Sequence, residues 1–148
     1  MPIPSKCEQV TSASKIKVEE LGRKAVFLNP TKAMHRKIQV DGCVIRDALA
    51  ADWVLSKDGI GDVIVELKGK NVEHGAKQCL ATAQFWSTNG LGQGRIAALI
   101  ICRQYPHTDT GVQVAQDRFR REYKGPLHVV TGRYEFDFER VLSFKGPR

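Results

Sequence analysis

A carboxylate and an ammonium stand two residues apart at the end of an otherwise apolar segment, GDVIVELKG, residues 61–69. Side chains alternate across a β-strand, so Glu66 and Lys68 point to one face and the neighbouring Val and Leu side chains to the other. Charged residues are rare in a protein core, whereas polar groups at the carboxyl end of a buried strand commonly line a ligand cleft. We therefore regard Glu66 and Lys68 as candidates for chemistry.

A second carboxylate, Asp52, precedes the partner strand of the same predicted hairpin. If the loop holds three residues, 58–60, Asp52 lies directly opposite Glu66 and on the same face, with the two Cβ atoms roughly 5 Å apart. A two-residue turn, Asp58-Gly59, would shift the register by one residue and turn Asp52 to the other face. The predicted pairing of the two carboxylates therefore depends on the length of the loop.

Two neighbouring carboxylates destabilise each other unless a positive charge lies between them. Magnesium suits such a place, because it takes oxygen ligands and commonly uses one or two carboxylates, a backbone carbonyl and several waters. An ammonium beside the ion can orient an attacking water or offset charge on the transition state of phosphoryl transfer. Asp52, Glu66 and Lys68 together thus predict a centre that cleaves phosphodiester bonds.

The order of features resembles the PD-(D/E)xK nuclease superfamily. It consists of an Asp, a hairpin with Glu-x-Lys on its second strand, and then a helix. The matching residues are Asp52 and the segment ELK, 66–68, and the order of elements is similar from about residue 15 to residue 102. The resemblance implies a restriction-endonuclease-like core of a helix, meandering strands, a second helix and a further strand. The proline of the family's motif is absent, since Ala51 precedes Asp52.

The resemblance also implies a role for each site residue. The two acids and the carbonyl of the residue between Glu and Lys would hold Mg²⁺, or Mn²⁺ in its place, and the lysine would handle the attacking water. In many members a glutamine on the second core helix supports the site, and some carry a further acid on the first helix, which Glu19 or Glu20 could match. The residues assigned in this way are Asp52, Glu66, Lys68 and Gln78, with the backbone carbonyl of Leu67 as a further metal ligand.

The same residues allow a structural interpretation. Glu66 and Lys68 could form an ion pair at the exposed end of a strand, which contributes little to stability, with Asp52 in a turn. Asp62 is an alternative first acid on the same face as Glu66. It starts the strand, about 13 Å from Glu66 at the rise of a β-strand, and this distance disfavours it.

The elements that position these residues follow from the hydrophobic pattern. Helices are predicted over 15–21, ending at Gly22, over 72–86, capped by Asn71, and over 112–123. We expect an α/β or α+β fold with a mixed central β-sheet flanked by helices, in one domain that spans 1–148 and has a flexible arm at 1–14. The predicted strands are 23–30, 36–45, 53–55, 62–68, 95–102, 127–130 and 134–142.

The charge balance favours a polyanionic partner. The 148 residues carry a formal net charge of +7, which is typical of proteins that bind nucleic acid and also occurs in proteins that do not. Basic residues that could follow a phosphate backbone stand near the site and along the last predicted helix, although such a run is more often a solvated face. They are Lys70, Lys77, Arg118, Arg120, Arg121 and Lys124.

Four cysteines, at positions 7, 43, 79 and 102, form no Cys-x-x-Cys pair. We expect them to be small buried thiols in a reducing compartment, not a disulfide framework or a zinc site. The longest apolar run, residues 96–102, is far too short to span a bilayer, and the N-terminus has no apolar signal region. The sequence therefore predicts a soluble cytoplasmic protein without membrane partners.

The leading hypothesis is a small Mg²⁺-dependent nuclease-like domain that hydrolyses DNA or RNA. The main alternative is a catalytically inactive module of the same fold that binds nucleic acid or a protein partner. A third is an immunity or structural protein in which the charges only stabilise the fold. The sequence contains no separate target-reading motif, so a homodimer or a partner protein could supply specificity.

Overall fold

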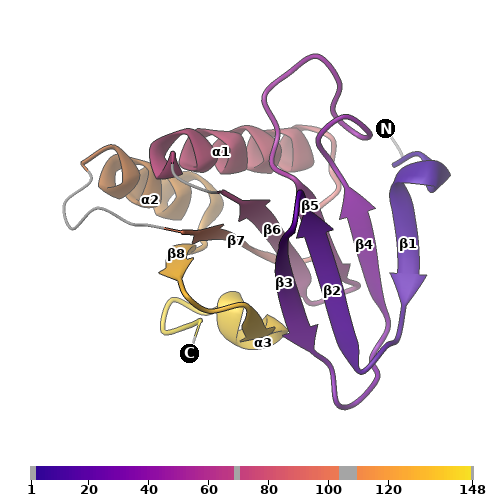
Figure 1. The fold of residues 1–148 in the computed structure, drawn as a ribbon. Coiled ribbons are helices and arrows are strands. Elements are labelled where there is room, and N and C mark those ends of the chain that lie inside the picture. Colours follow the sequence, from indigo (N-terminus) through magenta and orange to yellow (C-terminus); the bar gives the residue numbers. More distant parts are fainter. Residues whose placement is uncertain (1–2, 69–70, 104–109, 148) are drawn as a thin grey trace.

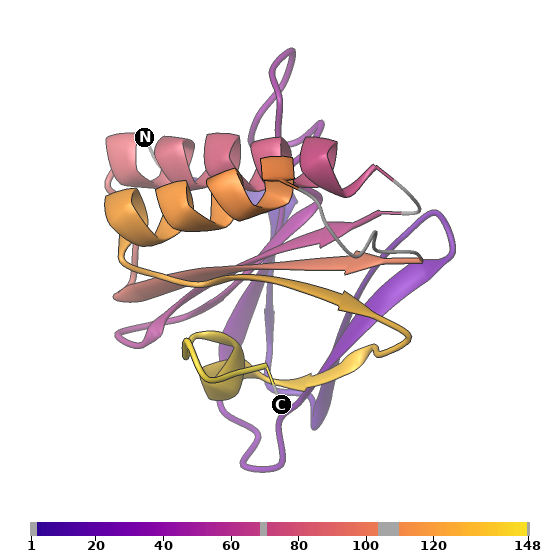
Figure 2. The same cartoon turned by 90° about the vertical axis from the view of Figure 1, so that its left-hand side faces the viewer.

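The computed structural model describes residues 3–68, 71–103 and 110–147. These residues form a mixed α+β fold in three layers (Figure 1). A six-stranded sheet lies in the middle, with helices α1 (Val72–Thr88) and α2 (Thr110–Tyr123) side by side over one face. A smaller sheet and the short helix α3 (Phe138–Val141) cover the other face (Figure 2).

The central sheet is mixed, in the order β1-β4-β5-β6-β7-β8. The first four of these strands pair antiparallel, and β6, β7 and β8 pair parallel. Every residue of β6 is buried, because this strand is central and both of its faces are covered. The strands are β1 (Glu8–Thr11), β4 (His35–Gln39), β5 (Trp53–Lys57), β6 (Gly61–Leu67), β7 (Arg95–Cys102) and β8 (Leu127–Thr131).

The faces of β6 belong to two different hydrophobic cores. Ile64 packs with the apolar sides of α1 and α2, whereas Val63, Val65 and Leu67 pack against the smaller sheet and α3. Side-chain alternation therefore places Glu66 on the face that α1 covers. The alternation of side chains along β6, which made Glu66 a candidate, thus places it beneath helix α1.

The predicted helix over 15–21 is wrong, because this segment is strand β2 (Lys15–Glu20). Strand β2 pairs antiparallel with β3 (Arg23–Leu28), which pairs parallel with β9 (Glu135–Asp137) to complete the smaller sheet. Buried Ile16 and Val18 alternate with exposed neighbours, which is the period of a strand. Leu21 and Gly22, both with positive φ, form the two-residue turn of this hairpin.

The predicted strand over 134–142 is correct only at its start. Strand β9 ends at Asp137, whose side chain accepts a hydrogen bond from the backbone N–H of Arg140 and caps α3. The predicted strand over 36–45 is correct only as far as Gln39, after which the chain turns at residues 40–45. The remaining predicted helices and strands are confirmed, with shifted boundaries. Helix α1 begins at Val72, and the Asn71 side chain caps it by accepting from the N–H of His74 at 3.0 Å.

The N-terminal segment is not a loose arm throughout. Residues 5–7 form a 3₁₀ turn, and β1 pairs with β4 at the edge of the central sheet. Cys7 and Cys43 form a disulfide that joins this segment to the connection between β4 and β5. The expectation of four buried thiols is therefore wrong for this pair, and it is confirmed for Cys79 and Cys102. A disulfide is uncommon in cytosolic proteins, so the cytoplasmic location stays a prediction that this pair does not favour.

No helix within residues 3–68, 71–103 and 110–147 is long and apolar enough to cross a membrane.

Candidate active site

The hairpin of β5 and β6 has the loop length that the two carboxylates require. Lys57 pairs with Gly61, so the loop holds three residues, 58–60. At the other end Trp53 pairs with Val65. One step further along each strand, Asp52 comes opposite Glu66 on the same face, as predicted for the three-residue loop.

Two hydrogen bonds lock the carboxylates side by side. The backbone N–H of Asp52 donates to Oε1 of Glu66 at 3.0 Å, and the N–H of Leu67 donates to Oδ2 of Asp52 at 2.9 Å. Asp52 is 9% exposed and Glu66 only 2%. Each acid thus accepts a hydrogen bond from a backbone N–H of the segment that carries the other acid. Neither is a turn residue or a surface charge.

Lys68 completes the group at the end of β6. Its Nζ lies 3.5 Å from Oε2 of Glu66, and its side chain is 24% exposed. Its backbone N–H donates to the carbonyl of Ile101 in β7 at 2.8 Å, which fixes where the side chain starts. The ammonium therefore stands between the buried carboxylates and solvent.

Burial makes the two acids hard to ionise. Loss of solvent raises the pKa of Glu66 to about 8, with repulsion from Asp52 adding to the rise and the ammonium of Lys68 opposing it. The pKa of Asp52 is also raised, chiefly by burial and further by the charges of Glu20 and Asp41, while the hydrogen bond from Leu67 lowers it. The site thus holds two acids where water is scarce, and a cation bound there would favour their ionised forms and offset their repulsion.

Helix α1 holds the chain that leads into Asp52. Nε2 of Gln78 donates to the carbonyl of Ala50 at 2.9 Å, and Oγ1 of Thr82 accepts from the N–H of Ala51 at 2.8 Å. The Thr82 hydroxyl donates in turn to the backbone carbonyl of Gln78 at 2.9 Å. Gln78, predicted to support the site, thus acts here through the backbone before Asp52. Thr82 has the same role and was not predicted. It lies four residues after Gln78 and so on the same side of the helix, and this spacing could have indicated its role.

Helix α1 comes close to the charged pair at a glycine. A Cβ added at Gly75 would lie 3.1 Å from Cγ of Lys68 and 3.4 Å from Cγ of Glu66. The absence of a side chain at Gly75 therefore leaves room for both residues. Cys79, one turn further along, is fully buried, and burial raises the pKa of its thiol well above the ordinary value, with the charges of Glu66 and Asp52 adding to the rise. Cys79 therefore stays a neutral thiol beside the two acids.

The donor atoms suit a hard cation. Asp52 and Glu66 each use one oxygen for a backbone hydrogen bond, so their second oxygens are available, with Lys68 near that of Glu66. Oε1 of Gln78 is buried and has no hydrogen-bond partner among the described residues, which is typical of a place for an ordered water. Within the same residues no group of three or more His, Cys, Asp or Glu is arranged to hold a metal ion. Two carboxylates completed by waters are enough for Mg²⁺.

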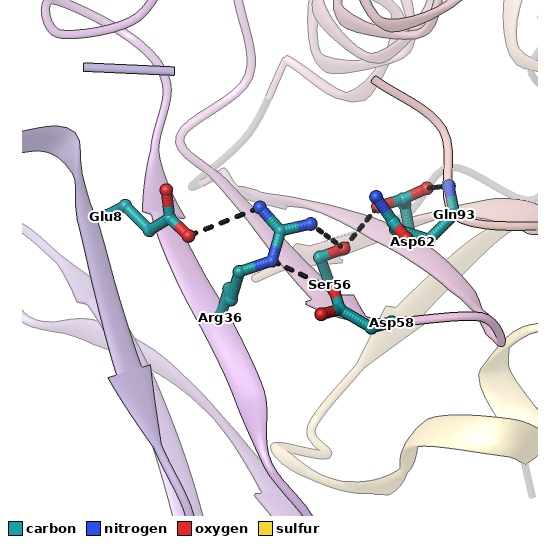
Figure 3. Close-up of polar contacts among 6 residues, drawn as sticks. All are labelled: Glu8, Arg36, Ser56, Asp58, Asp62 and Gln93. Carbon is teal, nitrogen blue, oxygen red and sulfur yellow. Dashed lines mark hydrogen bonds and ion pairs between the residues drawn. The ribbon is translucent and has the colours of Figure 1, made fainter. Parts of the chain in front are cut away.

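Asp62, the alternative first acid, lies at the opposite end of β6 in a separate network (Figure 3). It is fully buried, and it accepts from the Ser56 hydroxyl at 2.6 Å and from the N–H of Gln93 at 2.8 Å. Arg36 donates to the Ser56 hydroxyl at 3.1 Å and also contacts Glu8 and Asp58. Asp62 thus ties three strands and a loop together, away from Asp52 and Glu66.

Of the predicted basic residues that the structure describes, the contacts of four lie on α2 or in the pocket between α1 and α2. On α2 Arg118 pairs with Glu122 at 2.9 Å and Arg120 pairs with Asp117 at 3.2 Å, so acids on the same helix neutralise both. Nζ of Lys124 donates to a backbone carbonyl of α2. Arg121 and Lys77 are exposed, and Lys77 and Arg118 line the same surface pocket between α1 and α2. Lys70 lies outside the described residues.

No known protein family matches the chain, and comparison with curated proteins and with solved structures also found no match.

Proposed function

We propose that the protein is a metal-dependent nuclease that hydrolyses phosphodiester bonds of DNA or RNA at a PD-(D/E)xK-type site. The observation that carries the proposal is the pair of buried carboxylates, Asp52 and Glu66, locked together by two backbone hydrogen bonds with Lys68 beside them. A structural ion pair would not explain why two repelling acids are held together in a place that raises the pKa of both.

The order of elements supports the proposal from β5 onward. A hairpin carries the two acids, a helix packs over them, and β7 pairs parallel beside β6, as in a restriction-endonuclease-like core. The first helix of that core has no counterpart at residues 15–20, which form β2. Glu20, at the end of β2, is nevertheless close enough to raise the pKa of Asp52.

The residues that would hold Mg²⁺ or Mn²⁺ are Asp52, Glu66 and the backbone carbonyl of Leu67. When bound, the ion would supply a Lewis acid that polarises the phosphoryl group and offsets its charge. Binding would also favour the ionised form of Glu66, whose raised pKa otherwise keeps it protonated near neutral pH.

The other residues position groups and carry charge. The ammonium of Lys68, anchored by Glu66 and partly exposed, can donate a hydrogen bond that orients the attacking water and can stabilise negative charge on a phosphoryl oxygen. Gln78 and Thr82 hold residues 50 and 51, and so set the position of the Asp52 carboxylate. Because a proton and the metal ion compete for Glu66, whose pKa is raised, metal binding and with it activity at limiting metal should increase with pH.

The alternative is a module of the same fold that binds nucleic acid without cleaving it. It is favoured by the small donor set, since no third His, Cys, Asp or Glu joins the two carboxylates among the described residues. The two functions differ in whether the bound nucleic acid is cleaved when Mg²⁺ or Mn²⁺ is present.

The test combines metal binding with cleavage. Calorimetry should detect Mg²⁺ or Mn²⁺ binding to the wild type and no binding to Glu66→Gln. Plasmid DNA, single-stranded DNA and RNA should be cleaved with either ion and not in EDTA, and Asp52→Asn, Glu66→Gln and Lys68→Ala should abolish cleavage. The control Glu135→Gln removes an exposed carboxylate and should cleave as the wild type does. Metal binding without cleavage of any substrate would favour the inactive module, and no binding of either ion would overturn the metal site.

A further inference from the structure

Lys68 also lines a basic groove that neither carboxylate lines. It has a volume of about 420 Å³ and lies between the turn of the β2–β3 hairpin, the end of β7 and the loop that joins β8 to β9. This volume is in the range of sites that hold a small organic ligand. Among the described residues, no acidic side chain lines it. Its charged and aromatic lining residues are Arg23, Lys24, Lys68, Arg103, Arg133 and Tyr134.

The loop between β8 and β9 holds its two key side chains in place. Nε of Arg133 donates to the carbonyl of Glu135 and Nη2 to that of Pro147, each at 3.0 Å, and the guanidinium lies 5.0 Å from the ring centroid of Phe136. The backbone carbonyl of Tyr134 accepts from the N–H of Val26 in β3 at 2.7 Å. The Arg133 side chain thus ties residues 135 and 147 to this loop, and Tyr134 is presented from backbone fixed to β3, which lowers the entropy cost of binding a ligand.

Tyr134 is an aromatic surface among cations. Half of the residue is exposed, and Nζ of Lys24 lies 4.9 Å from its ring centroid. A half-exposed ring among cations is the combination that single-stranded nucleic acid uses, because bases stack on aromatic rings and phosphates follow the cations.

We propose that this groove binds a single-stranded segment of DNA or RNA, with one base stacked on Tyr134 and the adjoining phosphates on Arg23 and Lys24. The inference rests on the proposed function in one respect, namely that the bound strand continues to the phosphodiester held at Lys68. A single strand is favoured over a duplex, because the bases of a duplex are stacked on one another and cannot also cover a tyrosine ring. An acidic protein segment would use the cations but has no need of the ring.

The binding experiment is done in EDTA, so that no cleavage occurs. Fluorescence anisotropy measures the affinity of a labelled oligothymidylate, its RNA counterpart and a duplex of equal length, between about 50 and 200 mM salt. The test variants are R23E/K24E, Y134A and Y134F. The matched control is K15E/K32E, which changes the net charge equally with two exposed lysines; Lys15 pairs with Leu28 at the end of the β2–β3 hairpin remote from its turn.

Each variant has a definite expectation. R23E/K24E should weaken single-strand binding at least about ten-fold and lower the slope of log affinity against log salt by about 1.4, since each phosphate contact contributes about 0.7 for single strands. Y134A should weaken it about five- to hundred-fold, the effect of removing one stacked base, whereas Y134F should bind as the wild type does. The control should stay within about two-fold, and circular dichroism should show each variant folded.

Several results would overturn the groove. The groove proposal fails if R23E/K24E and Y134A bind with wild-type affinity, if the control loses as much affinity as the test variants, or if the wild type does not bind at all. It also fails if a duplex binds as tightly as a single strand, or if polyglutamate displaces the oligonucleotide while Y134A has no effect. The groove and the proposed function can fail separately. If the groove variants lose binding but the wild type never cleaves with Mg²⁺ or Mn²⁺, the groove stands and the nuclease proposal falls. If the wild type cleaves and the groove variants bind and cleave as well as the wild type, the nuclease proposal stands and the groove proposal falls.

Discussion

The buried carboxylate pair predicts that the metal-free protein loses stability as the pH rises. Glu66 has an ordinary pKa of 4.5, which burial and Asp52 raise to about 8 in the folded chain. Between these pH values the folded state holds a proton that the unfolded state has released, so the free energy of unfolding falls with increasing pH. One pKa unit is worth about 1.4 kcal/mol, so the loss is about 5 kcal/mol at most, and less where water enters as the pair ionises.

Glu66→Gln removes the titrating group and keeps the shape. The amide oxygen of the glutamine can still accept the hydrogen bond that the N–H of Asp52 gives to Oε1. We therefore expect Glu66→Gln to have nearly the stability of the wild type at about pH 5 and to be several kcal/mol more stable at about pH 9. Buried acids remote from the pair, such as Asp62, are present in both proteins and their contributions cancel in the difference, whereas Asp52 titrates together with Glu66 and belongs to the effect of the pair.

The assay is equilibrium urea unfolding in EDTA at several pH values, followed by the fluorescence of buried Trp86 and half-buried Trp53. Adding Mg²⁺ at about pH 8 should recover stability in the wild type and not in Glu66→Gln, because the ion replaces the lost proton as the neutralising charge. The exposed-acid variant Glu135→Gln serves as the control and should follow the wild type. Equal pH dependence in the wild type and Glu66→Gln would refute the argument that Glu66 is buried against a second acid.

Three further predictions concern the support of the site and of the fold. Gly75→Ala should keep the free energy of unfolding within about 1 kcal/mol of the wild type, because a better helix former offsets the close contact with Lys68. The same variant should lower the cleavage rate about ten-fold, because the added methyl group displaces the charged residues. An unchanged cleavage rate would refute the need for space at this position. Thr82→Val should cost about 1–3 kcal/mol in urea unfolding and reduce cleavage, because it leaves a buried N–H unpaired, and Thr82→Ser should restore both. Replacing Cys7 and Cys43 by serine should lower stability by about 4 kcal/mol, given a sequence separation of 36, and should make stability insensitive to dithiothreitol; a variant as stable as the oxidised wild type would contradict the pairing.

The pairing of Asp52 with Glu66 was predictable, because it depends on local rules. Alternation across a strand and the count of residues in one hairpin place the two acids on one face, and the three-residue loop makes that register real. The helix over Glu66 was likewise visible in its cap at Asn71 and in its apolar spacing. These features need only neighbours in the sequence.

The errors arose where distant segments decide. Residues 15–20 contain a strand pattern of only two buried positions, and their pairing with β3 outweighs the local preference that suggested a helix. Cys7 and Cys43 meet because β1 pairs with β4, with Glu8 opposite Ile38, and no spacing rule indicates this. By contrast, the expectation that basic residues of α2 follow nucleic acid stays a prediction. Arg118 and Arg120 pair with acids three and four residues away on the same helix, which is a local feature.

The sequence by itself therefore determined the three charged groups of the site and the hairpin and helix that carry them, because strand and helix periodicity is a property of adjacent residues. Only the tertiary structure decided how deeply the acids are buried, that Thr82 and Gly75 shape their surroundings, and that a basic groove meets Lys68. Burial and grooves arise where separate segments pack together, and the groove combines a hairpin turn at residues 22–24 with a loop at residues 132–134. More than a hundred positions of chain lie between these two segments, so only the fold brings Arg23 and Tyr134 to the same surface.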